Sequence, residues 1–410
     1  MKLCKTLLAL AIAVVSLASC SESADSNEQM TNYVTLSVEG ESAMTEDNED
    51  GLVVNVSMAY SLDHDVSVQL ALTGDEKGAV KLDKNTVTLP AGKKTASVKV
   101  VSNKANVLLT QEVVNVVVAS CSDANMKALD AKGVVLTIKP NAAVPELTAE
   151  QLALIKGYKD NLGIDLTKVL GIVDVTTTVT YGNDDKDAEN NGNDTRVFNG
   201  KSVITLSDKA TADKPVLKMI SNPMGMESYM YDRLLRCTTE EPDGYFDGDP
   251  VSVALENAAN YNKSTETFSV VLDNITLNND GTLNFTAVIK DDNDDDMTIV
   301  PFVYTYSVWT RLNNMANAGD VVEVDEGGKG VEYSIKDLIE QYGTFNPAKY
   351  LGNSDIAIDT YGATPSNFVS PSASYDFNNN AMSFEFSWDY GNGSYLYDYV
   401  RIKANYTMHK

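Results

Sequence analysis

Ala381-Met382-Ser383-Phe384-Glu385-Phe386-Ser387-Trp388-Asp389-Tyr390 is the stretch that sets the fold of this chain. Large apolar side chains stand at every second position, which is the period of a β-strand, whose side chains alternate between two faces. Gly391-Asn392-Gly393 follows and predicts a tight turn into a second strand from Tyr395 to Met408. The two strands therefore predict an antiparallel hairpin with an aromatic face.

Upstream of this hairpin, further short runs rich in apolar and β-branched residues predict strands, and Asn278-Asn279-Asp280-Gly281 predicts a second tight turn. We expect residues 146–410 to form an antiparallel β-rich domain, a sandwich or a partly closed barrel. The predicted strands are Ile172 to Thr180, Arg196 to Leu206, Val216 to Ile220, Tyr229 to Leu235, Phe268 to Leu272, Leu283 to Ile289 and Thr298 to Trp309.

One or two short helices interrupt this β pattern. Thr148 and Gln151 have the spacing of a capping box, apolar residues follow at helical spacing, and Gly163 suits the end of the helix. The run from Ser334 to Glu340 has a serine cap and stops at Gly343.

The region before the linker Pro140–Pro145 also alternates apolar and polar residues, in short runs separated by acidic turns. Such a pattern predicts a β-sandwich over residues 32–141. The chain is thus mainly β, with an N-terminal immunoglobulin-like sandwich followed by the larger β-rich domain.

The N-terminal region resembles Calx-beta and related immunoglobulin-like modules. The resemblance rests on Val87-Thr88-Leu89-Pro90-Ala91-Gly92, on the Val-rich strand that follows, and on Val135-Leu136-Thr137-Ile138 at the exit, and it covers about a quarter of the chain. It implies that calcium, in members that bind it, would meet acids at the loops, here Glu39, Glu41, Asp63 and Asp65. Gly78-Ala79-Val80-Lys81 stands where such modules have Gly-x-Asp-Tyr, which argues against calcium here.

The N-terminus carries a targeting signal. Lys2 and Lys5 precede an apolar run that is too short to span a bilayer, which is the layout of a secretory signal. Leu17-Ala18-Ser19-Cys20 resembles the lipobox of bacterial lipoproteins. The resemblance implies cleavage of residues 1–19 and lipidation of Cys20, followed by a polar, flexible tether over residues 20–31.

The order of lipobox, immunoglobulin-like module, helix and β-rich body resembles uncharacterised lipoproteins of the Bacteroidota. Glu22 and Asp25 resemble the acidic signal that sends such lipoproteins to the cell surface. The resemblance implies an outer-membrane protein, more often facing outward than toward the periplasm, whose lipid anchor contacts the outer-membrane lipid.

Composition excludes several function classes. The net charge of −26 disfavours nucleic acid, because a phosphate backbone is bound by clustered lysines and arginines. His64 and His409 are the two histidines, and no complete hydrolase, zinc or phosphate-loop motif occurs, so we expect a non-catalytic protein. Cys121 and Cys237 fall in different predicted domains and are expected to be separate thiols, although pairing stays open.

Aromatic residues give the first candidate site. Rings that lie flat on a sheet can stack on sugar faces or on a peptide, whereas aromatic residues on strands also fill β cores. Both interpretations are open from the sequence. The candidate ligand-binding residues are Trp388, Tyr390, Tyr395, Tyr397, Tyr399 and Trp309.

Acidic residues give the second candidate site. Five carboxylates crowd a six-residue run, where mutual repulsion favours Ca²⁺, although the spacing does not fit an EF-hand loop. A solvated hairpin loop is the alternative, so weak Ca²⁺ binding is the one cofactor considered. The candidate ligands are Asp291, Asp292, Asp294, Asp295 and Asp296.

Three functions remain open from the sequence. The first is an envelope lipoprotein that displays a glycan- or polymer-binding β domain, and it predicts polysaccharide binding that is lost on Trp388→Ala or Tyr397→Ala. The second is a structural or adhesive lipoprotein that binds other proteins through exposed sheet edges. The third is a carboxylate-based glycoside hydrolase, which needs two carboxylates facing one cleft.

Overall fold

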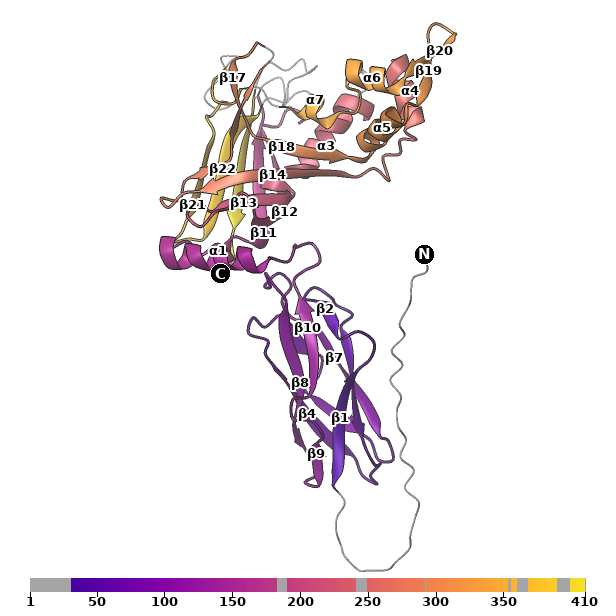
Figure 1. The fold of residues 1–410 in the computed structure, drawn as a ribbon, viewed down its shortest axis with the longest axis vertical. Helices are drawn as coiled ribbons and strands as arrows, with labels where there is room; N and C mark the ends of the chain where they lie inside the picture. Colours follow the sequence, from indigo (N-terminus) through magenta and orange to yellow (C-terminus); the bar gives the residue numbers. More distant parts are fainter. Residues whose placement is uncertain are drawn as a thin grey trace, which may run out of the picture.

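The structure, a computed structural model, describes residues 31–182, 190–240, 249–291, 293–352, 355–359, 368–388 and 399–409. The chain is mainly β and has two domains, an N-terminal β-sandwich and a larger body with helices at one side (Figure 1). No helix in the described ranges is long and apolar enough to cross a membrane. The predicted signal, Cys20 and tether lie outside the described residues.

The N-terminal domain is a sandwich of two five-stranded sheets. The first sheet has the order β5 (Val80–Leu82), β7 (Thr95–Ser102), β3 (Leu52–Met58), β1 (Asn32–Val38) and β9 (Met126–Ala128). The second has the order β2 (Ala43–Thr45), β10 (Val134–Lys139), β8 (Glu112–Cys121), β4 (Val66–Thr73) and β6 (Thr86–Leu89).

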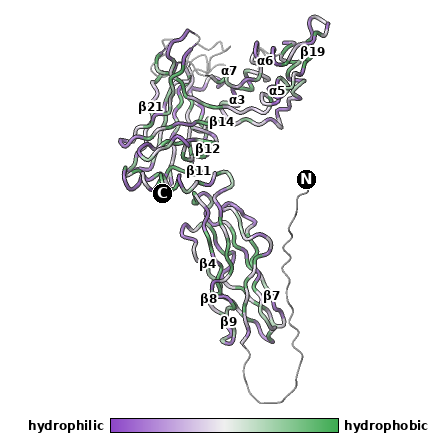
Figure 2. The backbone as a smooth tube through the Cα atoms, viewed as in Figure 1, coloured by the Kyte–Doolittle hydropathy of each residue, from purple (hydrophilic) through white to green (hydrophobic). Residues whose placement is uncertain are grey.

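Alternation along the strands explains this sandwich. Val54, Val56, Val98 and Val100 point inward and are fully buried, while the residues between them face solvent. Figure 2 shows hydrophobic segments running along the strands of this domain. The four outermost strands are only three or four residues long, and short edges protect a sheet against pairing with other chains.

The C-terminal domain is built on one long antiparallel sheet that curls on itself. Its order is β15 (Leu283–Asn284), β14 (Phe268–Leu277), β13 (Val216–Ser221), β12 (Thr195–Leu206), β11 (Gly171–Thr180), β23 (Val400–Thr407), β22 (Ala381–Trp388) and β21 (Ser372–Asp376), with β18 (Phe302–Tyr306) also paired to β14.

The two ends of this sheet meet. A β-bridge joins Thr282 to Ser374, and the backbone N–H of Tyr375 donates to the carbonyl of Gly281 over 2.7 Å. The result is a nearly closed barrel, and the predicted fold class is confirmed. Two hairpins stand outside it, β16 (Ala287–Lys290) with β17 (Asp296–Ile299) and β19 (Val321–Asp325) with β20 (Gly330–Ser334).

The barrel interior contains a polar network beside its apolar core. The hydroxyl of Tyr406 accepts the backbone N–H of Met224 over 2.8 Å and lies 2.9 Å from the Ser202 hydroxyl. Thr177 donates to the carbonyl of Met224. The 3-10 turn η3 (Pro223–Gly225) therefore lies inside the barrel, and side chains from the strands form hydrogen bonds with its backbone. Buried polar groups generally need such partners.

Helices are more numerous than the sequence predicted. They are α1 (Ala149–Gly157), which continues as the π-helical turn η1 (Tyr158–Leu162), the 3-10 turn η2 (Leu166–Lys168), α3 (Glu227–Leu235) with its π-helical continuation η4 (Arg236–Glu240), α4 (Pro250–Ala258), α5 (Ser307–Ala318), α6 (Ile335–Tyr342) and α7 (Pro347–Leu351). The capping box at Thr148 and the helix between Ser334 and Gly343 are both confirmed.

Two predicted strands are wrong. Tyr229 to Leu235 lies in α3, where Tyr229, Met230, Arg233 and Leu234 are buried at helical spacing. The predicted strand from Thr298 to Trp309 is divided in the structure: its start lies in β17, its middle forms β18 on the barrel sheet, and α5 begins at Ser307. In both segments a helix places the apolar residues on one face, where they are buried in the hydrophobic core of the C-terminal domain.

A buried carboxylate holds the end of the N-terminal domain that faces the C-terminal domain. Glu46 accepts the backbone N–H groups of Val107 over 2.8 Å, Leu108 over 3.1 Å and Asn141 over 3.1 Å. Burial raises the pKa of Glu46 against the opposing effect of these hydrogen bonds. The neighbouring Leu109 packs against the C-terminal core, so Glu46 ties that loop to the start of the linker.

Replacement of Trp388 by alanine should destabilise the C-terminal domain by about 3–5 kcal/mol, because it leaves a large cavity in a fully buried site. Thermal or urea unfolding followed by near-UV circular dichroism measures the loss. Val303→Ala, on an exposed position of β18, is the control and should change stability by less than about 0.5 kcal/mol. Equal stability of the Trp388 variant and the parent would contradict this burial.

Candidate functional site

The described residues of the predicted aromatic platform on the C-terminal hairpin are buried. Trp388 and Tyr399 are 0% exposed, so neither can meet a ligand on the outside of the barrel. Trp388 packs against Tyr229, with 5.8 Å between ring centroids. The prediction of these two residues as ligand-binding is therefore corrected. The sheet curls around the face that carries Trp388, whereas Tyr399 precedes β23 and is buried against Phe368, with 5.1 Å between ring centroids. Tyr390, Tyr395 and Tyr397 lie outside the described residues.

The acidic run forms the turn of the β16–β17 hairpin. The carboxylate of Asp291 accepts the backbone N–H groups of Asn293 over 2.9 Å and Asp295 over 2.8 Å. Hydrogen bonding from the Asp295 backbone is the main reason that the pKa of Asp291 is lowered. Asp296 pairs with Lys290 at 2.9 Å.

The described acids of this run are not gathered as metal ligands. Asp294 extends the turn with a positive φ of 66°, and Asp292 lies outside the described residues. Across the described ranges, no group of three or more histidine, cysteine or acidic side chains is arranged to hold a metal ion. The geometry therefore supports the solvated-loop alternative over the predicted calcium site.

Trp309, one of the predicted ligand-binding residues, lies at a cleft. It is half-buried on α5, and the cleft lies between α5, α6 and the turn before α7, with a volume of about 500 Å³. A volume of this size suits a small organic ligand. The lining residues are Trp309, Asn313, Ala316, Asn317, Lys336, Ile339, Glu340, Gln341, Tyr342, Gly343, Asn346 and Lys349.

Helical geometry explains why α5 presents these residues. Trp309, Asn313 and Ala316 are spaced i, i+4 and i+7, so they share one face of the helix. Ser307 and Arg311 are each two residues from Trp309, which places them about 200° around the axis. One side of α5 therefore faces the cleft while the other is available for fixing the helix.

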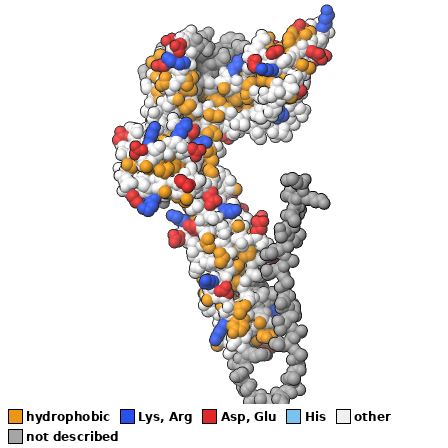
Figure 3. Space-filling model, viewed as in Figure 1, with side chains coloured by type: hydrophobic (Ala, Val, Ile, Leu, Met, Phe, Trp, Pro, Cys, Tyr) orange, Lys and Arg blue, Asp and Glu red, His pale blue; other side chains and the backbone are white. Residues whose placement is uncertain are grey.

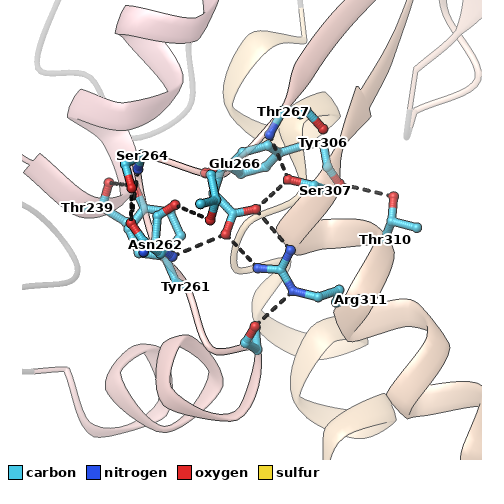
Figure 4. A network of polar contacts seen from close by, with 12 residues as sticks. Thr239, Tyr261, Asn262, Ser264, Glu266, Thr267, Tyr306, Ser307, Thr310 and Arg311 are labelled. Atoms are coloured by element: carbon cyan, nitrogen blue, oxygen red, sulfur yellow. Dashed lines mark hydrogen bonds and ion pairs between the residues drawn. The ribbon is translucent and has the colours of Figure 1, made fainter.

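That other side is fixed by an ion pair with Glu266, which lies in the connection between α4 and β14 (Figure 4). Arg311 donates to both carboxylate oxygens, with Nη1 3.0 Å from Oε2 and Nη2 2.6 Å from Oε1. Its Nε also donates to the Ala259 carbonyl over 2.8 Å, and Ser307 donates to Oε2. Bidentate pairing sets orientation as well as distance, so it fixes the rotation of α5.

The environment of Glu266 determines its pKa. Burial alone would raise that pKa, since the side chain is 1% exposed, but hydrogen bonds from Arg311, Ser307 and the Asn262 backbone outweigh burial and the pKa is lowered. The Glu266 carboxylate is therefore ionised at neutral pH, and both of its oxygens accept hydrogen bonds from Arg311.

The second wall of the cleft is α6. Ser334 caps its start by accepting the backbone N–H of Asp337, and Gly343, with a φ of 59°, ends it. Lys349 donates to the carbonyl of Tyr342 at the end of α6, and its ammonium lies 5.3 Å from the centre of the Tyr350 ring. Burial lowers the pKa of Lys349.

Sequence reasoning missed most of this cleft because it extended a strand through Trp309. The signal was present: Val308, Leu312 and Ala316 are spaced four residues apart, are buried, and precede Gly319, which ends the helix. Asn313, Asn317, Gln341 and Asn346 had no distinguishing pattern in the sequence. Their common position comes from the packing of α5 on α6.

The structure also places the cysteines and one of the histidines that the sequence singled out. Cys121 and Cys237 lie in different domains, and no disulfide joins these two described residues. His409 bonds through Nε2 to the Leu170 carbonyl at 3.2 Å, and burial lowers its pKa. On the visible face, acidic and basic side chains are interspersed (Figure 3).

Comparisons place both domains in families of unknown function. Residues 145–407 match the family model described as "Domain of unknown function (DUF8472)", and residues 28–143 match "Domain of unknown function (DUF4929)". No curated protein matches the sequence.

Two solved structures show distant similarity. A two-domain protein of unknown function from Bacteroides fragilis NCTC 9343 is 12% identical with a TM-score of 0.21, and the match covers 47% of this chain and 66% of that one, just under two thirds of its length. CBD12 from CALX1.2 is 11% identical with a TM-score of 0.22, and the match covers 50% of this chain and 90% of that one.

Glu266→Gln should destabilise the helical side of the C-terminal domain by about 1–3 kcal/mol at neutral pH, because Arg311 loses a charged bidentate partner. The pKa of Glu266 is lowered on folding, so its contribution is present above the unfolded value near 4.5 and is lost as pH falls through the folded value. Urea unfolding of parent and variant at several pH values measures this.

The difference between parent and Glu266→Gln should shrink as the pH falls below about 4.5. Lys290→Gln, which removes an exposed ion pair with Asp296, is the control and should cost less than about 1 kcal/mol. A Glu266→Gln effect that grows toward low pH would contradict the lowered pKa.

Proposed function

The chain belongs to the family described as a domain of unknown function (DUF8472), and we propose that it is a non-catalytic, lipid-anchored envelope protein that binds a glycan in the cleft between α5 and α6. The observation that carries this proposal is the combination of Trp309 and Tyr342 with four carboxamide side chains around one cleft. The proposal keeps Trp309 from the sequence prediction and replaces the hairpin rings by the helical cleft.

The chemistry of the cleft suits a sugar. An indole or phenol ring packs against the apolar C–H face of a pyranose, and carboxamides donate to and accept from its hydroxyl groups. Asn313, Asn317, Gln341 and Asn346 supply such groups around the same space. The open side of the cleft would let a longer polymer extend past it.

The sequence and topology support display from a membrane surface. The lipobox-like Leu17-Ala18-Ser19-Cys20 and the polar tether precede β1. Because β2 follows β1 closely and pairs with the last residues of β10, the end of β1 lies near the linker and its start lies at the opposite end of the sandwich. The sandwich would therefore stand between the anchor and the glycan-binding domain, on the outward face of the outer membrane.

The structure favours this proposal over the other two functions. The sandwich edges are short and the barrel is nearly closed, so adhesion through sheet edges would have to use the two hairpins outside the barrel, β16–β17 and β19–β20, whose strands have only four or five residues. A hydrolase needs two carboxylates about 5–10 Å apart in the cleft. Of the described residues that line it, Glu340 is the one carboxylate, and it pairs with Lys336.

Trp309→Ala should weaken glycan binding about tenfold or more, because it removes the ring on which the sugar stacks. The lipid-free chain from residue 21 onward, screened on a polysaccharide panel and measured by affinity electrophoresis, tests this. Tyr60→Ala, an exposed aromatic of the N-terminal domain, is the matched control and should bind like the parent. Full binding by the Trp309 variant would rule out this cleft.

Cys20→Ser should abolish lipid attachment, because the thioether needs the cysteine sulfur. Metabolic labelling with a radioactive fatty acid in a Gram-negative host, followed by membrane fractionation, measures it. The parent should carry label and sediment with outer membranes, whereas the variant should carry none. Cys121→Ser is the control and should remain labelled; labelled Cys20→Ser protein would disprove the anchor.

A further inference from the structure

We infer that the cleft between α5 and α6 takes a neutral, hydroxyl-rich saccharide and discriminates against acidic ones. This inference rests on the proposed function and names the ligand class of the same site. It follows from the charges, helix ends and carboxamide groups that the cleft presents.

The cations of the cleft are already engaged. Lys336 pairs with Glu340 at 3.7 Å, one turn away on α6. Lys349 donates to the Tyr342 carbonyl and lies over the Tyr350 ring, so it caps the end of α6. Each lysine of the described lining therefore has an intramolecular partner that competes with a carboxylate or sulfate group, although the Lys336–Glu340 pair is solvent-exposed.

The cleft is lined along the length of both helices, from Trp309 to Asn317 on α5 and from Lys336 to Gly343 on α6, and this lining includes the C-terminal turn of each. The lining includes Ala316 and Asn317 near the end of α5, and Gln341, Tyr342 and Gly343 at the end of α6. Carbonyl groups at a helix C-terminus carry partial negative charge. They attract hydroxyl donors and repel anions, and the net charge of −26 adds to the repulsion of a polyanion.

Two carboxamides of the lining have orientations that their partners fix. The Asn313 Nδ2 donates to the Trp309 carbonyl over 2.8 Å, so Oδ1 remains an acceptor. The Asn346 Oδ1 accepts the Ala348 backbone N–H over 3.0 Å as the cap of α7, so Nδ2 remains a donor. A carbonyl can only accept and an N–H can only donate, which excludes the flipped amides.

The cleft therefore offers separate acceptors and donors and no uncommitted charge. A sugar hydroxyl both donates and accepts, so it can satisfy Asn313 and Asn346 together. A carboxylate group accepts only, so it cannot donate to Asn313 as a hydroxyl can.

The experiment compares neutral and acidic polymers on the lipid-free chain of both domains. Dextran, laminarin and mannan are the neutral probes, and polygalacturonate and alginate are the acidic probes. Affinity electrophoresis at 20 and 500 mM NaCl should show retardation by at least one neutral polymer, with less than a twofold change between salts and no retardation by the acidic ones.

Asn346→Asp is the decisive variant. Aspartate keeps the oxygen that caps α7 but replaces the two N–H donors by an acceptor, so folding is retained while neutral-polymer binding weakens about tenfold. Lys329→Gln, on the exposed β19–β20 turn, is the control for a change in net charge and should bind like the parent. Unchanged binding by a folded Asn346→Asp protein would overturn the inference.

The polymer panel separates this inference from the proposed function. Binding that depends on Trp309 but is strongest for an acidic polymer and falls with salt would overturn the neutral-ligand inference and leave glycan binding standing. Loss of binding to an acidic polymer on Lys336→Gln or Lys349→Gln would likewise overturn the neutral-ligand inference and leave glycan binding standing. Retardation by no polymer, or retardation that Trp309→Ala does not alter, would overturn the proposed function itself.

Discussion

The curling of one antiparallel sheet around its aromatic face is the constraint on which the C-terminal domain depends. Phe384, Phe386 and Trp388 all lie on that face of β22 and are fully buried, and the bridge from Thr282 to Ser374 nearly closes the barrel around them. Burial of a large aromatic side chain contributes several kcal/mol, so these residues stabilise the fold and leave the outer face polar. Among the described residues, the cleft that we propose as the ligand site lies outside the barrel.

The helices at the side of the barrel provide it. The α5 helix starts directly after β18, which pairs with β14, so the sheet fixes where the helix begins. The ion pair between Glu266 and Arg311 fixes which side of α5 faces the cleft. A buried ion pair is weak evidence for stability, but its bidentate geometry specifies one orientation of the helix, which a binding site on a helix needs.

The contact between the two domains bears on the proposal that the sandwich separates a lipid anchor from the cleft. Glu46 accepts three backbone N–H groups, two from the loop before Leu109 and one from the linker. Leu109 in turn packs against the C-terminal core. Glu46 thereby holds the loop and the start of the linker together within the sandwich, and Leu109 makes the contact with the C-terminal domain.

The sequence by itself determined the mainly β character, the two domains and the helices begun by Thr148 and Ser334, because strand alternation and helix caps are local signals. It mistook Tyr229 to Leu235 and the residues around Trp309 for strands, since short apolar runs fit both periods. Only the tertiary structure decided that Trp388 is core and Trp309 lines a cleft. Closure of the barrel and packing of α5 on α6 bring together residues that are far apart in the chain. No local sequence pattern encodes which face of a strand or helix becomes buried by such contacts.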